Sequence, residues 1–515
     1  MKDARLTRPK DKFFAEMNQQ FIGLTFADVK LRSSYSEVDP RTADVHTRFS
    51  RHIGLNIPIV SAAMDRVTEH LMARVMAIAG GMGVIHRNLT PEAQAAEVAK
   101  VKNFLNALIP SPVCVSQNQT VTEIQNMRKT QSLSFQSFPV INPNGQLVGV
   151  ITEDCFDFCT NVDSTAGEIM IAQCCSAKEG TSLETAFGTM MRERVKALPL
   201  TNEEGFVVGM YVWSDVQPIV TKSRANYNLD GSGRLRVAAA VGTGEAELLR
   251  AQLLIEAGVD AIVLDGAHAD QYRMYDMLKR LKDTHPNVDV VVGNVSEGDS
   301  AERLAKAGAD AVKVGQGCGA ICLTGDVAGY GRPQLSAVYD CAYRVKGFDI
   351  PIIADGGINY SGDITKAIGA GAHSVMLGRL LAGCMEAPGD IVIVNGARLH
   401  SYDGMGSPRA LRESVACQQR YNQEGMAKDR FVAEGVEALV PATGSVTDVL
   451  HQLVGGLRSG MGATGSPDIE ALRENAKFTL LTQNGVVETR PHHLTEVLPT
   501  EALPSNRGVG VDHDG

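Results

Sequence analysis

The chain has 515 residues, of which 44% are hydrophobic and 21% charged, a composition typical of a globular protein with two or three domains. Its net charge of −10 argues against nucleic-acid binding through broad electrostatic attraction. No apolar run approaches the ~18 residues that a membrane-spanning helix needs, and the charged N-terminus lacks the apolar core of a secretory signal. Without such a signal, the ten cysteines indicate reduced thiols and a cytoplasmic location.

Two short apolar runs near the N-terminus predict buried strands. "IPIVSAAM" begins at Ile57 and "GGMGVIHRN" begins at Gly80. Runs of the same kind return only after about residue 236. We therefore expect residues 1–104 to form the first part of a domain that is interrupted and resumes later.

The interruption contains an internal duplication. "FPVINPNGQLVGVITEDCF" from Phe138 and "LPLTNEEGFVVGMYVWSDV" from Leu198 share a strand, a turn with glycine, a second strand, and then a Thr or Ser close to an Asp. Gly149 and Gly209 lie at equivalent points, 209 − 149 = 60 residues apart. A duplication of this size predicts one supersecondary unit paired with its copy.

This repeat, which we place at residues 105–224, resembles a tandem pair of cystathionine-β-synthase (CBS) modules, also called a Bateman domain. The resemblance implies that adenine or guanine nucleotides bind between the copies, with Thr152, Asp154, Ser214 and Asp215 holding ribose and phosphate. Alternatively, these four polar side chains merely cap the helices that follow them.

After residue 236, short β-branched runs alternate with helical stretches such as "EAELLRAQLLIEAG" from Glu245. Together with the two N-terminal strands, this alternation predicts an α/β fold, a (β/α)8 TIM barrel interrupted by the tandem CBS modules. The predicted strands end in polar or glycine residues: Asp265, Asn294, Gly315, Asp355 and Gly378. These residues should gather on one face, because the C-terminal strand ends of such a barrel form its active-site face. We assign residues 225–490 to the rest of the barrel and residues 491–515 to a C-terminal tail.

One loop at this face contains a conspicuous cysteine. "VGQGCGAICLTGDVAGYGRPQ", residues 314–334, places Cys322 on glycine-rich backbone just after the strand "ADAVKVG". A structural cysteine would more often be buried inside the strand, whereas a thiol displayed at a strand's C-terminal end suits a nucleophile. From these residues alone, both interpretations stay open.

The order of motifs resembles the inosine 5′-monophosphate (IMP) dehydrogenase and guanosine 5′-monophosphate (GMP) reductase family over roughly residues 20–490. The motifs are "GLTFADVKL", "SAAMD", "GGMGVIHRNLTPEAQAAEV", "GRLRVAAAVG", "GNV", "IADGGI", "YDGMGS", "QRY" and "GGLRSGMGATG". The closest resemblance is to the dehydrogenases, which implies oxidation of IMP to xanthosine 5′-monophosphate (XMP) with NAD. The alternatives are a GMP reductase, which forms IMP and ammonia with NADPH, and an inactive nucleotide-sensing paralogue.

The family resemblance implies a covalent mechanism. Cys322 would attack carbon 2 of the purine, and Thr324 and Glu434 would form a dyad that handles protons. Arg420 and Tyr421 would belong to a mobile flap that enters the vacated cofactor site and helps to activate water. A reductase needs no such hydrolytic flap, so these two residues favour the dehydrogenase.

The same resemblance implies the binding residues. Those for the substrate are Met64, Ala320, Asp355, Gly356, Gly357, Gly378, Arg379, Tyr402, Met405 and Gly406. Those for NAD, or alternatively NADP, are Asp265, Asn294, Gly315 and Gly317. A monovalent cation, usually potassium, would bind Gly317, Gly319 and Cys322, with a neighbouring subunit contributing Gln483, Asn484 and Gly485. This arrangement implies a homotetramer or octamer.

The chain departs from the family pattern at substrate and cofactor contacts. Ala320 and Arg379 stand where the family usually has serines, and a guanidinium at 379 would replace the lost hydroxyls with a bidentate phosphate contact. Gly266-Ala267-His268 replaces a usual serine pair, and Ala63 replaces a usual proline. The predicted catalytic residues are all present, so we expect the chemistry to be kept.

Overall fold

The computed structural model describes residues 8–110, 112–130, 137–221 and 225–489, so the predicted tail lies outside the described residues. Two compact units are present. The first is drawn from Met1–Lys102 and Asn226–Gly515, and the second from Asn103–Ala225. Within the described ranges, no helix is both long and apolar enough to cross a membrane.

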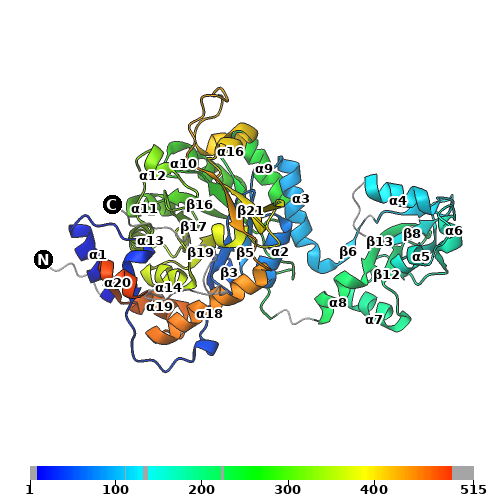
Figure 1. Cartoon of the computed structure of the whole chain (residues 1–515), viewed down its shortest axis with the longest axis horizontal. Helices are drawn as coiled ribbons and strands as arrows, with labels where there is room; N and C mark the ends of the chain where they lie inside the picture. Colours follow the sequence, from blue (N-terminus) through cyan, green and yellow to red (C-terminus); the bar gives the residue numbers. More distant parts are fainter. Residues whose placement is uncertain (1–7, 111, 131–136, 222–224, 490–515) are drawn as a thin grey trace. The chain divides into compact units, whose positions relative to one another are not determined.

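Eight parallel strands of the first unit close into a barrel (Figure 1). Around the barrel they are β14 (Ala238–Val241), β15 (Ala261–Asp265), β16 (Asp289–Val295), β17 (Ala311–Val314), β18 (Ile352–Asp355), β19 (Ser374–Leu377), β4 (Ile59–Ser61) and β5 (Met82–Ile85). Because β4 pairs with β19 and β5 pairs with β14, the two N-terminal strands complete the barrel across the insertion. The predicted α/β barrel is confirmed.

Helices cover the outside of this barrel. They are α2 (His70–Ile78), α3 (Pro91–Lys102), α9 (Glu245–Glu256), α10 (Tyr272–Thr284), α11 (Gly298–Lys306), α13 (Gln334–Arg344), α14 (Ser361–Ala370) and α18 (Val446–Thr464). Small buried side chains such as Ala62, Ala240 and Ala311 alternate inside the barrel with branched ones such as Val263 and Val291. This filling makes the barrel interior a packed core, so ligands can enter only at its ends.

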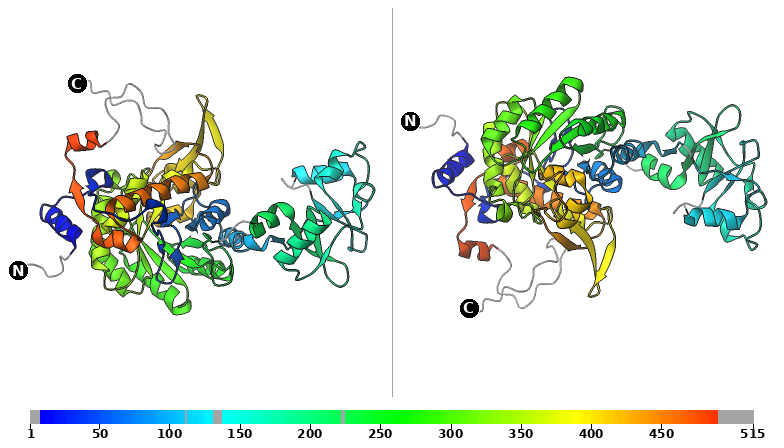
Figure 2. Two further views of the ribbon diagram at one scale, coloured as in Figure 1. Left: turned by 90° about the horizontal axis from the view of Figure 1, so that it is seen from below. Right: turned by 90° about the horizontal axis from the view of Figure 1, so that it is seen from above.

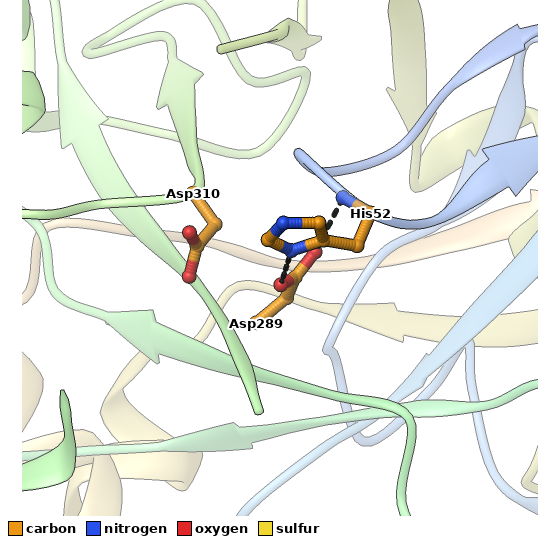
Figure 3. Close-up of side chains that lie close together, drawn as sticks. All are labelled: His52, Asp289 and Asp310. Carbon is orange, nitrogen blue, oxygen red and sulfur yellow. Dashed lines mark hydrogen bonds and ion pairs between the residues drawn. The ribbon is translucent and has the colours of Figure 1, made fainter. Parts of the chain in front are cut away.

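A hairpin of β2 (Thr47–Arg48) and β3 (Gly54–Leu55) closes the N-terminal end of the barrel. Figure 3 shows His52 of this hairpin against Asp289, which accepts bonds from the His52 amide (2.9 Å) and Nδ1 (2.7 Å). Asp310 beside them pairs with Arg51 and Lys282. Because these carboxylates already have cationic or N–H partners, we interpret the cluster as structural: it fixes the β2–β3 hairpin to the N-terminal end of the barrel.

The segment between β19 and α18 forms much of the C-terminal face of the barrel, the end opposite to the β2–β3 hairpin. It consists of α15 (Arg379–Ala382), β20 (Ile391–Val394), β21 (Ala397–Asp403), α16 (Pro408–Glu413), α17 (Val415–Arg420) and β22 (Glu437–Pro441). The three strands form an antiparallel sheet in the order β20-β21-β22, and Figure 2 shows the β20–β21 hairpin projecting from the barrel unit. The connection from β21 to β22 therefore begins and ends beside the barrel mouth.

Helix α1 (Pro9–Gln19), near the start of the described residues, packs against β23 (Phe478–Leu480), near their end, through Phe13 and Phe478. α1 precedes β1 (Val29–Leu31), which pairs with β23 between α19 (Ile469–Asn475) and α20 (Gln483–Glu488). Phe14 of α1 stacks on Tyr339 of α13, with ring centroids 4.0 Å apart.

The second unit contains two four-stranded sheets with the same internal pattern. Their orders are β10-β9-β8-β7 and β11-β12-β13-β6, where the central pairs are β8 (Phe138–Ile141) with β9 (Leu147–Ile151) and β12 (Ala197–Thr201) with β13 (Val207–Val212). Val140 lies opposite Gly149 and Leu200 lies opposite Gly209, and the register shifts just after each of these pairs. The duplication seen in the sequence is thus repeated in strand pairing, whereas its likeness to CBS modules stays a prediction.

The remaining elements of the second unit flank these pairs. The strands are β6 (Leu108–Ile109), β7 (Val115–Ser116), β10 (Ile171–Ala172) and β11 (Ala177–Lys178), and the helices are α4 (Val121–Thr130), α5 (Glu153–Asp157), α6 (Ala166–Ile169), α7 (Leu183–Glu193) and α8 (Trp213–Thr221). α5 and α8 follow the second strand of each repeat, which places Thr152 and Ser214 at the starts of these two helices.

Candidate active site

A cavity of about 230 Å³ lies at the C-terminal ends of the barrel strands. Most of the residues predicted from the sequence line it: Met64, Asp265, Asn294, Gly315, Gly317, Gly319, Ala320, Cys322, Asp355, Gly356, Gly357, Gly378, Arg379, Tyr402, Met405, Arg420 and Tyr421. They come from the C-terminal ends of six barrel strands (β4, β15, β16, β17, β18 and β19), from β21 and from the β21–β22 connection. The fold therefore gathers them in one place, although it does not by itself assign their roles.

The Cys322 loop is held by a short antiparallel bridge to the segment before β22. Leu323 N donates to Glu434 O (2.8 Å) and Val436 N donates to Ile321 O (3.1 Å), with Cys322 opposite Gly435. A Cβ atom on Gly435 would lie 3.2 Å from Ile321 O, so a larger residue would push the two segments apart. The bridge fixes Cys322 at the cavity wall.

Thr324 contacts the Cys322 thiol, and Glu434 belongs to the segment bridged to the Cys322 loop. Cys322 Sγ donates to the Thr324 hydroxyl at 3.2 Å, and Thr324 is 4% exposed at the start of α12 (Thr324–Val327). Glu434 Oε2 is buried and has no hydrogen-bond partner among the described residues. This buried oxygen is open to a hydrogen-bond donor beside the loop, where the predicted dyad would use it.

Arg420, at the end of α17, reaches across the cavity mouth. Its Nη1 forms an ion pair with Asp265 Oδ2, and the two side chains are 13% and 4% exposed. Burial lowers the pKa of the Arg420 guanidinium from its ordinary value, and burial also raises the pKa of Tyr421 to about 12. Both side chains are thus withdrawn from water beside Cys322, which is the environment that the predicted flap needs.

The flap segment also packs on apolar side chains. Met405, Leu411 and Cys417 form a buried cluster against which Met64 and Tyr421 pack. A Cβ atom on Gly406 would lie 2.8 Å from Tyr421 Cζ, so the absence of a side chain at Gly406 lets the ring approach.

Two residues that the sequence analysis did not single out hold this face together. Arg87, 2% exposed after β5, donates to the Gln419 side chain at 3.1 Å and so contacts the residue before Arg420. Lys313 of β17, also 2% exposed, contacts Asn294, Asp265 and Asp355. A signal existed for Lys313, because a lysine inside an apolar strand is almost never buried without a partner.

Features suited to a nucleoside monophosphate surround Asp355. Gly356 and Gly357, which follow it, have φ values of +90° and +77°, a conformation that glycine adopts without strain. The Gly357 N–H donates no hydrogen bond among the described residues, so it remains open to an anion. Arg379 donates to Asn359 Oδ1 at 3.1 Å, and a Cβ atom on Gly378 would lie 2.8 Å from the Tyr402 hydroxyl.

The predicted cation ligands do not form one site within this chain. Gly319 O already accepts a bond from Cys322 N (3.1 Å), and Gly317 lines both the first cavity and a second one of about 950 Å³. Val486 of α20 and Thr489, the residue after this helix, line this second cavity, whereas Gln483, Asn484 and Gly485 do not. Within the described residues, the three loop residues predicted to bind the cation thus line the first cavity, whereas the three predicted residues of α20 line neither cavity.

The four residues predicted to bind a regulatory nucleotide lie at helix starts in the second unit. Thr152 precedes α5 and contacts Cys155, and Ser214 donates to Asp215 at 3.2 Å in the first turn of α8. Asp154 Oδ2 lies 3.9 Å from Lys196 Nζ of the other repeat. The two repeats thus approach each other near these residues, but the described contacts fit helix capping as well as nucleotide binding.

Comparison with known proteins decides the family. The model of the IMP dehydrogenase / GMP reductase domain matches residues 23–492 of the chain. The chain belongs to the IMP dehydrogenase / GMP reductase family. It is 45% identical to the inosine-5′-monophosphate dehydrogenase of Aquifex aeolicus over 473 residues, which is 91% of this chain and 95% of that protein. It is 41% identical to the Chlorobaculum tepidum dehydrogenase over 491 residues, 94% of this chain and 98% of that protein.

Solved structures of the other family branch are similar as well. A cysteine-to-alanine variant of GMP reductase from Trypanosoma brucei, in complex with guanosine 5′-monophosphate, matches with a TM-score of 0.79 and 35% identity over 92% of this chain and 98% of that one. The second unit, residues 103–225, makes up 123 of 515 residues, or about 24% of the chain. A match over 92% must include most of it, so possession of this unit does not separate dehydrogenase from reductase within the family.

Proposed function

We propose that this chain is an IMP dehydrogenase. In the first half of the reaction, Cys322 sulfur bonds to carbon 2 of IMP and a hydride leaves that carbon for NAD, which accepts hydride when bound. The product of this half is a thioimidate on Cys322. Water then adds to carbon 2 and the carbon–sulfur bond breaks, which releases XMP and returns a proton to the thiol. The overall balance is IMP, NAD⁺ and water to XMP, NADH and a proton.

The observation that carries the proposal is the position of Arg420 and Tyr421. Both line the cavity that contains Cys322, and Arg420 is paired with the buried Asp265. A thioimidate must be hydrolysed, and polar groups withdrawn from bulk water next to the sulfur can orient and activate the attacking water. A reductase has no hydrolytic step and gives no reason to hold an arginine and a tyrosine there.

The residues at the cavity mouth also fit a dinucleotide. The buried Asp265 carboxylate, freed when Arg420 swings away, would accept bonds from the nicotinamide ribose. Asp355 would accept from the ribose of IMP, with Gly357, Gly378, Arg379 and Tyr402 around its phosphate, and with Met405 and Gly406 beside the base. In this arrangement Thr324 and Glu434 carry the thiol proton away and return it after hydrolysis.

The direct test is an assay of the purified chain with IMP plus NAD and, separately, with GMP plus NADPH, followed at the nicotinamide absorbance. We expect NADH formation from the first pair and no NADPH oxidation with the second. Turnover of GMP with NADPH alone would replace the proposal by its alternative, GMP reductase, which the similarity to the Trypanosoma brucei structure favours. Turnover of neither pair would favour a nucleotide-sensing protein.

Three finer proposals accompany this function. The chain assembles as a homotetramer or octamer, because the predicted cation site is incomplete without Gln483, Asn484 and Gly485 of a neighbour. Potassium bound to the carbonyls of Gly317, Gly319 and Cys322 then supports the loop. Residues 105–224 bind adenine or guanine nucleotides as CBS modules. Light scattering with and without ATP or GTP, and assays with potassium replaced by lithium, test these points; a fully active monomer would contradict the first.

A further inference from the structure

A lysine lies buried between the two carboxylates that the proposed function assigns to the two ribose rings. Lys313 projects from β17, and its side chain is 3% exposed. Its Nζ lies 3.0 Å from Asp265 Oδ1 and 2.7 Å from Asp355 Oδ2, and it also contacts Asn294 Oδ1. Asp265 ends β15 and Asp355 ends β18, and these two strands are separated in the barrel by β16 and β17. The ammonium group of Lys313 therefore links the ends of two strands that are not neighbours.

Each carboxylate uses one oxygen for Lys313 and keeps the other. Asp265 turns Oδ2 to Arg420, the residue that must leave when a cofactor enters. Asp355 Oδ2 also accepts from Asn294 Nδ2 (2.9 Å), whereas Asp355 Oδ1 has no interaction among the described residues. The lysine therefore fixes which oxygen of each aspartate is available, and it does so for the two residues at once.

A structural requirement alone does not explain a charged residue at this position. Burying an ammonium group is costly, and a buried ion cluster is often no more stable than apolar residues of the same volume. Without Lys313, however, Asp265 and Asp355 would face each other's charge, and the remaining ion pair to either carboxylate among the described residues is that of Arg420 with Asp265. Since the flap residue is expected to leave during each turnover, Lys313 is the cation that stays.

We propose that Lys313 is a positioning residue that orients Asp355 toward the substrate ribose and Asp265 toward the cofactor ribose, and so couples the two subsites. The inference rests on the proposed function for the identity of the two ligands. It extends that function by assigning the shared support of both subsites to one side chain.

The chain contains a matched control for the experiment. Lys102, at the end of α3, is 1% exposed and lies 2.8 Å from both Asp230 and Asp260. Asp260 directly precedes β15, at the opposite end of the barrel from Asp265. Lys102→Met therefore removes a buried lysine from between two aspartates without touching the cavity.

The test measures IMP binding by calorimetry in the absence of cofactor, KM for NAD in steady state, and melting temperature, for Lys313→Met, Lys313→Arg and Lys102→Met. We expect Lys313→Met to weaken IMP binding and raise KM for NAD, each by about 10-fold or more. Lys313→Arg, which keeps the charge, should recover most of the IMP affinity. Lys102→Met should lower the melting temperature and leave both ligand constants within about 2-fold.

A double variant keeps the proposal testable if Lys313→Met does not fold. Lys313→Met with Asp265→Asn removes one carboxylate along with the lysine, so Asp355 no longer faces a second negative charge. It should bind IMP about 10-fold or more weakly than Asp265→Asn alone, because Asp355 has lost the ammonium group that orients it. Wild-type IMP affinity in Lys313→Met, or an equal loss of IMP affinity in Lys102→Met, would overturn the proposal. If the wild type uses GMP and NADPH instead, the same measurements with GMP test Lys313 separately from the proposed reaction.

Discussion

Arg420 and Asp265 form an ion pair between the end of α17 and the end of barrel strand β15. The pair joins the segment expected to move during catalysis to the residue expected to bind the cofactor ribose. Under the proposed function, the Arg420 guanidinium and a ribose hydroxyl would compete for the space beside Asp265 Oδ2. If the proposed function is right, the described conformation is the one with the flap closed, and the cofactor would have to displace Arg420 to reach Asp265.

Arg420→Ala should separate the two halves of the reaction. In the proposed reaction, hydride transfer would take place with the flap away from Asp265, so a rapid burst of about one NADH per active site should survive. Hydrolysis should slow by roughly two or more orders of magnitude, because the group beside the thioimidate is lost. Stopped-flow absorbance gives the burst and the steady rate, and mass spectrometry of quenched enzyme should find the adduct on Cys322.

The control for this variant is Arg412→Ala, an exposed arginine of the neighbouring helix α16. It should leave both the burst and the steady rate unchanged. Unaltered IMP turnover in Arg420→Ala would remove the flap assignment, and absence of a burst would mean that Arg420 acts before hydride transfer.

Cys322→Ala and Cys318→Ser should differ sharply, although the two thiols are four residues apart. Cys322 faces the Thr324 hydroxyl, whereas Cys318 Sγ donates to Asp355 O at 3.3 Å. Burial and then the Asp355 charge raise the pKa of Cys318 well above its ordinary value, which disfavours the nucleophilic thiolate. We expect Cys322→Ala to lose turnover while binding IMP nearly normally by calorimetry, and Cys318→Ser to keep most of its activity. Substantial turnover by Cys322→Ala would exclude the covalent route.

The barrel could be predicted because its strands carry a strong local signal. Runs such as "DAIVLD" and "IPIIADGG" are apolar, β-branched and bounded by glycine or aspartate, and the C-terminal ends of parallel strands meet by topology alone. The gathering of Asp265, Asn294 and Asp355 at one cavity follows from that rule. The duplication in the second unit was detectable for a similar reason, since Gly149 and Gly209 occupy equivalent positions in two strand pairs.

The partners of these residues could not be predicted, because they depend on contacts between distant segments. Arg87 reaching Gln419 joins residues 332 positions apart, and no local pattern encodes such a pair. Lys313 was visible as a charge in an apolar strand, but only the packing of β15, β17 and β18 shows that it meets two aspartates. The pairing of Arg420 with Asp265 likewise depends on where the β21–β22 connection folds back.

Arg379→Ala tests the departure from the usual serine at this position. Arg379 lines the cavity near Gly357 and Gly378 and donates only to Asn359 Oδ1 in the described contacts. If its guanidinium binds the substrate phosphate, its loss should raise KM for IMP by about 10- to 100-fold with little change in kcat. Arg398→Ala, an exposed arginine of β21, is the matched control. An unchanged KM would mean that backbone amides and Tyr402 hold the phosphate without Arg379.

Trp213, the single tryptophan of the chain, offers a direct readout of the second unit. It precedes Ser214 and Asp215 and stacks on Phe187 with ring centroids 5.4 Å apart. A nucleotide bound at Ser214 and Asp215 should change its fluorescence in a saturable manner when ATP or GTP is titrated. Asp215→Asn should abolish the change, and Asp163→Asn, an exposed aspartate of the same unit, should not. No change with either nucleotide would leave the four polar residues as helix caps.

Glu97 gives a prediction for acid stability. It lies in α3, is 8% exposed, and accepts from the His70 amide (2.8 Å), His70 Nδ1 (2.7 Å) and Lys100 Nζ (2.6 Å), which ties α3 to the first turn of α2. Burial raises the pKa of Glu97, but the bonds from His70 and Lys100 outweigh it and lower the pKa to about 2, from 4.5 without these contacts. The native state therefore favours the ionised form more than the unfolded chain does.

The sign of the resulting pH dependence follows from linkage. The stabilisation by ionised Glu97 is fully present above about pH 4.5, the pKa of this group in the unfolded chain. It is lost as the pH falls from about 4.5 toward about 2, because in this range the unfolded chain binds a proton at Glu97 and the native state does not. Glu97→Gln should melt about 2–4 °C below the wild type at neutral pH, and this gap should shrink as the pH falls below about 4.5. Glu92→Gln, an exposed glutamate in the first turn of the same helix, should follow the wild type throughout. A difference in melting temperature between Glu97→Gln and the wild type that stays constant down to about pH 3 would contradict this prediction. It would show that the charge on Glu97 does not stabilise the α2–α3 contact, because a contribution from that charge must change with pH.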